Sequence, residues 1–92
     1  MQITFIGGGN MASALIGGLL KRGGNAAEIS VVELQADGRE RLARDFGVRA
    51  VEAPDVEAMR CDVLVLAVKP QQMREVCAGL APHLNSQTVL SI

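Results

Sequence analysis

The sequence predicts a doubly wound α/β fold in three layers, with a parallel sheet between two layers of helices. Short apolar runs alternate with segments of helical period along all 92 residues. The run DVLVLAV at 62–68 is apolar without alternation, which is typical of a parallel strand buried on both faces. Three consecutive glycines at 7–9 separate the first run from the first helical segment, as in the turn of a Rossmann-type domain.

The first strand is expected at 2–6, QITFI, a mostly apolar run that ends at glycine. A helix follows from Asn10, with Lys21 and Arg22 in its last turn and Gly23 after it, because cations and glycine suit a helix C-terminus. The apolar stripe of this helix, read from helical spacing, consists of Met11, Ala14, Leu15, Gly18 and Leu19.

A second helix is expected at 38–46, between two short strands. Leu42 and Phe46 are predicted to point inward from it. Glu40 and Arg44 are four residues apart on the same helix, a spacing that allows them to pair.

Four further strands complete the predicted sheet, at 29–32, 48–51, 62–68 and 88–92. Pro70 suits the first turn of a last helix between the final two strands. We expect the sheet to be incomplete at its C-terminal edge and the 92 residues to be the front part of a longer protein. The inner face of the last helix is predicted to consist of Met73, Val76, Cys77 and Leu80.

The composition restricts the function classes. The net charge is −1, the isoelectric point is near 5.7, and two Phe are the sole aromatic residues, so neither a phosphate-binding patch nor base-stacking rings indicate a nucleic-acid partner. No apolar run approaches the ~20 residues that cross a bilayer. Cys61 and Cys77 have no metal-ligand spacing, and we interpret them as reduced core thiols of a cytoplasmic protein without a metal site.

The segment from Gly7 to Ala12 fits the G-x-G-x-x-A pattern of a dinucleotide-binding turn. Gly7 would form the tight turn, Gly9 would let the backbone approach a pyrophosphate, and Ala12 would let the helix pack closely on the strand. The free N–H groups at the helix N-terminus would face the phosphates. We therefore assign cofactor binding to Gly7, Gly8, Gly9, Asn10, Met11 and Ala12.

Glu33 follows the second predicted strand, near the offset at which an acidic residue binds the adenosine ribose 2′-OH. A carboxylate there favours NADH, because it would repel the 2′-phosphate of NADPH. Arg39 and Arg41 follow on the next helix and offer an alternative, in which one of them turns to hold that phosphate. Glu33 could also be a solvated carboxylate at a strand end.

Residues 67–70 leave the most apolar strand at its carboxyl end, the edge at which open α/β sheets bind ligands. Pro70 biases Lys69 toward an extended conformation. We therefore add Ala67, Val68, Lys69 and Pro70 to the candidate cofactor site, beside the nicotinamide half. Lys69 could instead be a solvated lysine, and His83 is interpreted as a surface or loop residue.

The segments IGGGNMASALIGGLL (6–20) and DVLVLAVKPQ (62–71) together resemble the N-terminal nucleotide-binding domain of pyrroline-5-carboxylate reductases, and the resemblance covers all 92 residues. It implies a cytoplasmic enzyme that reduces 1-pyrroline-5-carboxylate to L-proline with NAD(P)H, the last step of proline biosynthesis. It also implies that residues 7–12 wrap the pyrophosphate and that residues 67–70 flank the nicotinamide ribose.

The same resemblance implies that the substrate pocket and the homo-oligomer interface belong to a helical C-terminal domain absent from this chain. No catalytic residue is therefore assigned, and the chain alone is expected to be inactive. Two departures concern the cofactor: Glu33-Leu34 replaces a polar or basic pair that suits NADPH, and Pro54 replaces an Asn of some members. Glu33 thus favours NADH, whereas the family resemblance favours NADPH.

Two other functions stay open at this point. The fold suits other NAD(P)-dependent reductases, such as hydroxyacid dehydrogenases or deazaflavin-dependent nicotinamide reductases. A non-catalytic module that senses the nucleotide and reports redox state to a partner is the alternative from a different class.

Overall fold

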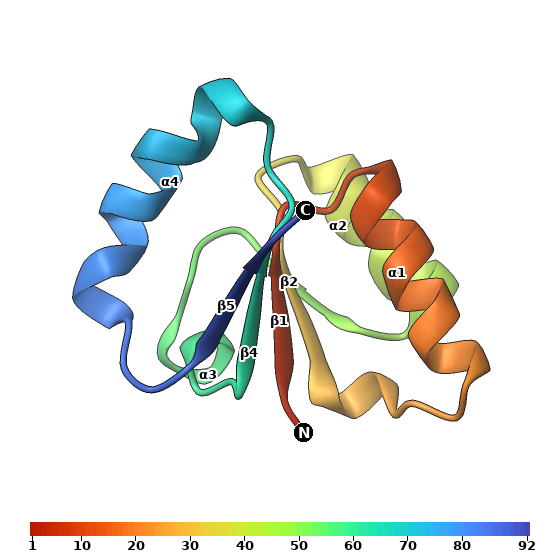
Figure 1. The fold of residues 1–92 in the computed structure, drawn as a ribbon. Coiled ribbons are helices and arrows are strands. Elements are labelled where there is room, and N and C mark those ends of the chain that lie inside the picture. Colours follow the sequence, from red (N-terminus) through yellow and green to blue (C-terminus); the bar gives the residue numbers. More distant parts are fainter.

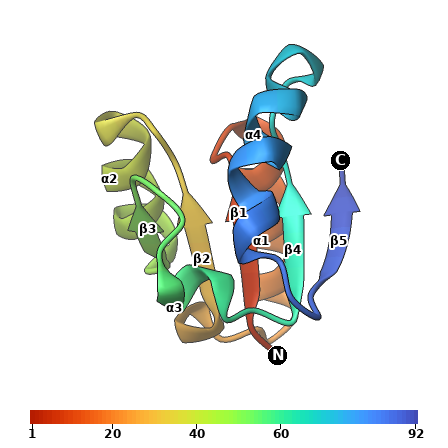
Figure 2. The ribbon, with the colours of Figure 1, turned by 90° about the vertical axis from the view of Figure 1, so that its left-hand side faces the viewer.

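The computed structural model describes the backbone of residues 1–92 and every side chain except that of His83, so the expectation for this histidine lies outside the described residues. Its centre is a five-stranded sheet in the order β3-β2-β1-β4-β5, with every neighbouring pair parallel (Figures 1 and 2). This order confirms the predicted Rossmann-type fold. The strands are β1 (Ile3–Ile6), β2 (Ile29–Val32), β3 (Arg49–Val51), β4 (Val63–Leu66) and β5 (Thr88–Ser91).

Helices cover both faces of the sheet, which gives the three expected layers (Figure 1). One face carries α1 (Asn10–Lys21) and α2 (Ala36–Phe46). The other carries the short α3 (Val56–Met59) and α4 (Met73–Leu80), and Figure 2 shows α4 in front of β1 and β4. Three single 3₁₀ turns connect the elements, at Ala26–Glu28, Pro70–Gln72 and Ala81–His83.

The central strands are buried on both faces, as the unbroken apolar run predicts. On β1, Phe5 packs toward α1 and α2, whereas Ile6 packs toward α3 and α4. On β4, Val65 packs on the same face as Phe5, and Leu64 packs on the same face as Ile6. The sheet therefore has an apolar core on each face, and packing on both faces holds the carboxyl ends of β1 and β4 side by side.

The buried stripe of α1 differs from the predicted one except at Leu19, which packs against the core. Ala12 and Ile16 are completely buried, whereas Met11 is 62% and Leu15 41% exposed. The helix is apolar almost all round, so helical spacing is satisfied by more than one face. The small Ala12 side chain lets α1 pack closely on the sheet. The buried face is therefore the one with Ala12 and Ile16, each one residue after the predicted Met11 and Leu15.

Three further predictions about side chains were wrong, in whole or in part. Cys77 is exposed and Cys61 half-buried, so they are free thiols but not both core residues. The stripe of α4 that reaches the sheet is narrower than predicted and consists of Met73, Val76 and Leu80. The expected ion pair of α2 is also absent among the described contacts, since the Arg44 Nε atom lies 3.2 Å from the Asp45 Oδ1 atom instead.

Helix α3 was not predicted, because four residues are too few for helical periodicity to appear. Asp55 caps it by accepting the Ala58 N–H at 2.8 Å, and the Arg49 guanidinium binds the same carboxylate. The hydrogen bond from Arg49 is the main reason why the pKa of Asp55 lies below its ordinary value. On the sheet side, the Thr4 hydroxyl donates to the Ala58 carbonyl at 2.5 Å.

The remaining boundaries differ slightly from the prediction. β4 is shorter than the run at 62–68: Asp62 precedes it, and Ala67 and Val68 follow it and line the cavity described below. α2 begins two residues earlier than predicted, at Ala36. Within the described residues, no helix has both the length and the apolar composition that crossing a bilayer requires.

Candidate functional site

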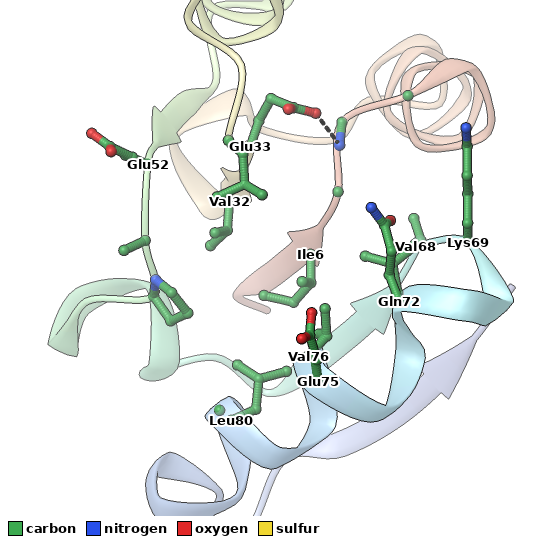
Figure 3. Close-up of a pocket in the computed structure, with 18 of the residues that line it drawn as sticks. Ile6, Val32, Glu33, Glu52, Val68, Lys69, Gln72, Glu75, Val76 and Leu80 are labelled. Atoms are coloured by element: carbon green, nitrogen blue, oxygen red, sulfur yellow. Dashed lines mark hydrogen bonds between the residues drawn. The ribbon is translucent and has the colours of Figure 1, made fainter.

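A cavity of about 530 Å³ lies at the carboxyl ends of β1 to β4, beside the point where the strand order reverses between β1 and β4 (Figure 3). Open α/β sheets bind their ligands at this position. The cavity is lined by the loops that follow these strands and by one face of α4. The sequence-predicted residues that line it are Gly7, Gly8, Gly9, Glu33, Ala67, Val68 and Lys69.

The three glycines of the β1–α1 turn differ in what an added side chain would meet. Gly7 has a φ of +99°, and a Cβ atom there would lie 2.6 Å from the Ala67 carbonyl oxygen. A Cβ atom on Gly8 would lie 2.6 Å from the Cδ1 atom of Leu42 on α2. A Cβ atom on Gly9 would meet nothing within 4 Å. The backbone therefore requires glycine at position 7, and a side chain at position 8 would displace the buried Leu42 methyl group. The third position has open space in front of it.

The N-terminus of α1 opens on this space. Gly9 is the N-cap residue in an extended conformation, no side chain caps the helix, and its first turn carries no acidic residue. Such an end offers free N–H groups and the positive end of the helix dipole to an anion. Asn10 and Met11 are exposed there without being part of the cavity wall, and Ala12 is buried beneath them.

Glu33 stands at the rim of the cavity, directly after β2, and its carboxylate points to the glycine turn (Figure 3). The Oε1 atom accepts the Gly8 N–H at 2.9 Å, and the Oε2 atom accepts the Gln35 N–H at 2.8 Å. Gly38 makes room for this side chain, since a Cβ atom there would lie 3.0 Å from the Glu33 Cγ atom. A contact with a cofactor ribose stays a prediction.

The two arginines considered for a 2′-phosphate both bind backbone carbonyls of these loops. The Arg39 Nη1 atom donates to the carbonyl oxygens of Glu33 and Leu34, at 2.8 and 2.9 Å. The Arg41 Nη2 atom donates to the Gly8 carbonyl oxygen at 3.2 Å. Sequence reasoning did not find the Arg41 contact, because no local pattern relates residues 33 positions apart.

The segment after β4 forms the opposite wall. The Ala67 N–H donates to the Ile6 carbonyl at 2.8 Å, which holds this segment against the end of β1. Lys69 is extended, with φ −66° and ψ 149°, as the following proline predicts. Its side chain is exposed at the mouth of the cavity (Figure 3). Pro70 begins the 3₁₀ turn that leads into α4, outside the cavity lining.

Sequence reasoning also missed the α4 wall. Gln72, Glu75, Val76, Gly79 and Leu80 line the cavity, and their spacing of i, i+3, i+4, i+7 and i+8 is the signal that was available. Figure 3 shows the Gln72 and Glu75 side chains directed toward the cavity.

The charged side chains of the cavity lining are mainly acidic. The lining includes three carboxylates, those of Glu33, Glu52 and Glu75, and one ammonium group, that of Lys69. No group of His, Cys, Asp and Glu residues in the described part of the chain has a metal-binding arrangement. The arrangement is therefore a largely apolar slot with an acidic rim, next to a helix N-terminus that attracts anions.

Comparisons with known proteins agree with this geometry. The family model described as coenzyme F420-dependent NADP oxidoreductase matches residues 2–92. A pyrroline-5-carboxylate reductase of Pseudomonas aeruginosa is 45% identical over 92 residues, which cover 99% of this chain and 34% of that protein. The structure of a pyrroline-5-carboxylate reductase from Coxiella burnetii superposes with a TM-score of 0.92 at 36% identity, over 99% of this chain and 34% of that one.

A third match is a semialdehyde dehydrogenase NAD-binding protein from Cupriavidus necator, solved in complex with calcium and NAD. Its TM-score is 0.79 at 29% identity, over 99% of this chain and 32% of that one. The chain thus spans about a third of the length of the proteins that it matches. It belongs to the family described as coenzyme F420-dependent NADP oxidoreductases, and over its whole length it is similar to pyrroline-5-carboxylate reductases.

Proposed function

We propose that residues 1–92 are the NAD(P)H-binding domain of a pyrroline-5-carboxylate reductase, an oxidoreductase that reduces 1-pyrroline-5-carboxylate to L-proline. The observation that carries the proposal is Gly9. This glycine lines the cavity at an uncapped helix N-terminus, and no protein atom explains why it has no side chain. The similarity to reductases of this name supports the choice of reaction.

The residues present fit a dinucleotide. The N-terminus of α1 behind Gly9 would receive the pyrophosphate, and the apolar slot beside Val68 would receive one half of the cofactor. The cofactor supplies the hydride, and this chain's residues bind and orient it. Ala67 to Pro70 would flank the nicotinamide ribose, and their backbone is fixed by the bond from Ala67 to Ile6.

In this proposal the chain does not act alone. It spans about a third of the related reductases, so substrate contacts, catalytic groups and the homo-oligomer interface would lie in the rest of such a protein. We propose that the whole enzyme is cytoplasmic and that residues 1–92 bind the cofactor without turning over substrate.

The acidic rim bears on the choice between the two cofactors. The 2′-phosphate of NADPH would approach the rim that carries Glu33 and Glu52, whereas a ribose 2′-OH could donate to a carboxylate. We therefore expect NADH to bind more tightly than NADPH. Glu52→Gln should tighten NADPH binding about two- to fivefold, the size of an exposed charge interaction, and leave NADH nearly unchanged.

The experiment is a parallel titration of the purified chain with NADH and NADPH, followed by nucleotide fluorescence. Tighter NADH binding agrees with the acidic rim. Tighter NADPH binding keeps the reductase proposal but shows that an arginine, such as Arg39, leaves its carbonyl partners for the phosphate. Binding of neither nucleotide to a chain whose circular dichroism shows the fold intact would contradict the proposed cofactor site.

A further inference from the structure

We propose that Glu33 and Arg41 are positioning residues that hold the Gly8 peptide groups from two sides and so keep the glycine turn in its binding shape. The inference rests on the proposed function, in which the glycine turn binds a nucleotide. It adds a role that differs from ribose recognition: the two side chains would act on every nucleotide that uses the turn.

The geometry at Gly8 supports this role. Its N–H donates to the Glu33 Oε1 atom at 2.9 Å, and its carbonyl oxygen accepts from the Arg41 Nη2 atom at 3.2 Å. Gly8 is buried, and the site of its missing Cβ is blocked by Leu42, the neighbour of Arg41. A buried N–H without a partner is costly, so the Glu33 carboxylate satisfies a group that the fold has removed from water.

The carboxylate is itself held in place. Its second oxygen accepts the Gln35 N–H at 2.8 Å, and the Arg39 guanidinium holds the Glu33 carbonyl at 2.8 Å. Both carboxylate oxygens therefore bond to backbone N–H groups of two different loops. The side chain ties the end of β2 to the glycine turn, instead of standing free in the cavity.

Specific consequences for binding follow. The Gly8 N–H is already bonded inside the protein, so the donors left for a phosphate are those of the α1 first turn behind Gly9. The orientation of that first turn depends on the glycine turn, which Glu33 and Arg41 hold against α2. Because NADH and NADPH carry the same pyrophosphate, loss of this support should weaken both to the same degree.

Arg41→Met is the main test, because it removes the guanidinium and keeps most of the aliphatic side chain. We expect the Kd of the purified chain to rise about tenfold for NADH and by the same factor for NADPH, the scale of one lost hydrogen bond to a charged group. The matched control is Arg44→Met. Arg44 lies on the same helix, carries the same charge and bonds to Asp45, so its loss should leave both Kd values unchanged.

A second measurement needs no nucleotide. Amide hydrogen exchange at Gly8, followed by NMR, should be slow in the parent chain and at least about tenfold faster in Glu33→Ala. A rise in Kd for NADPH alone in Arg41→Met would identify Arg41 as a phosphate ligand and overturn the positioning role. Unchanged Kd values, or unchanged Gly8 exchange in Glu33→Ala, would also overturn it.

The proposed function and the positioning role fail separately. If the folded parent chain bound neither nucleotide, the proposed function would be contradicted, and the exchange experiment would still decide whether Glu33 holds Gly8. Faster exchange in Glu33→Ala would then support the structural part of the inference, and unchanged exchange would reject it.

Discussion

Replacing Gly9 with valine separates the requirements of folding from those of binding. The Cβ position of Gly9 faces open space, and its φ of −75° and ψ of −165° are extended values that valine adopts. In Gly9→Val the new methyl groups would occupy the space in front of α1, where the proposed pyrophosphate lies. We therefore expect a folded protein that no longer binds NADH or NADPH.

The expected change in stability is small because two effects oppose each other. Losing glycine restricts the unfolded chain, which stabilises the fold by ~0.4–1 kcal/mol where the native dihedral angles suit the new residue. Valine is a poorer N-cap residue than glycine, which costs a similar ~0.5–1 kcal/mol. The free energy of unfolding should therefore stay within about 1 kcal/mol of the parent value, as measured by urea denaturation.

The expected loss of binding is much larger. Moving the pyrophosphate from the helix N-terminus breaks at least two hydrogen bonds to a charged group, each worth ~1.5–3 kcal/mol, so the Kd should rise by more than ~100-fold. The assay is a titration followed by nucleotide fluorescence. Gly8→Ala is the contrasting variant: its Cβ would lie 2.6 Å from the Leu42 Cδ1 atom, and such overpacking costs about 1–3 kcal/mol of stability.

An unchanged Kd in a folded Gly9→Val protein would refute the placement of the pyrophosphate. Unfolding of that variant would refute the argument that Gly9 faces empty space. We thus expect Gly9→Val to lose nucleotide binding with little change in stability, and Gly8→Ala to lose stability.

Three further predictions concern the frame of the site. Gly7→Ala should cost at least ~1–2 kcal/mol in urea denaturation, because φ is +99° and the new Cβ would overlap the Ala67 carbonyl. Thr4→Val should cost ~1–3 kcal/mol in the same assay, since the buried Ala58 carbonyl loses its hydroxyl donor. Asp55 has a folded-state pKa below its ordinary 3.8, so the Asp55 carboxylate stabilises the folded state above pH 3.8. This stabilisation is lost as the pH falls through the lower folded-state pKa. In acid titrations followed by circular dichroism, Asp55→Asn should lack this part of the pH dependence.

The sheet could be predicted from the sequence because its signals are strong and local. The run at 62–68 is apolar without alternation, which favours a strand buried in a parallel sheet, and glycines at 7–9 mark the turn that leaves the first strand. Parallel strands bring their carboxyl ends to one edge, so Glu33 and Lys69 could be placed at one site without knowledge of their contacts. The strand order then follows from the usual topology of such folds.

Details that depend on packing could not be predicted. The stripe that includes Met11 and the buried stripe that includes Ala12 both satisfy helical spacing, and contact with the sheet decides between them. The bond between Arg41 and Gly8 joins residues 33 positions apart, and it depends on how α2 lies against the glycine turn. The α4 wall shows a pattern, but a stripe of Gln72 and Glu75 indicates a solvated face as readily as a cavity lining.

The glycine motif combines requirements that sequence reading cannot separate. Gly7 would be needed, and Gly8 favoured, in a protein of this fold that bound nothing, because their missing side chains make room for the Ala67 carbonyl and the Leu42 methyl group. Gly9 differs: as an N-cap residue it would be improved by serine, asparagine or aspartate, whose side chains accept hydrogen bonds from the first turn. Those side chains would also occupy the N–H groups that an anion needs. Helices α2 and α4 also lack a side-chain cap, but they carry Asp37 and Glu75 in their first turns. The α1 N-terminus has neither a cap nor an acidic residue and faces open space at Gly9, and this combination argues for an external ligand more strongly than the number of glycines does.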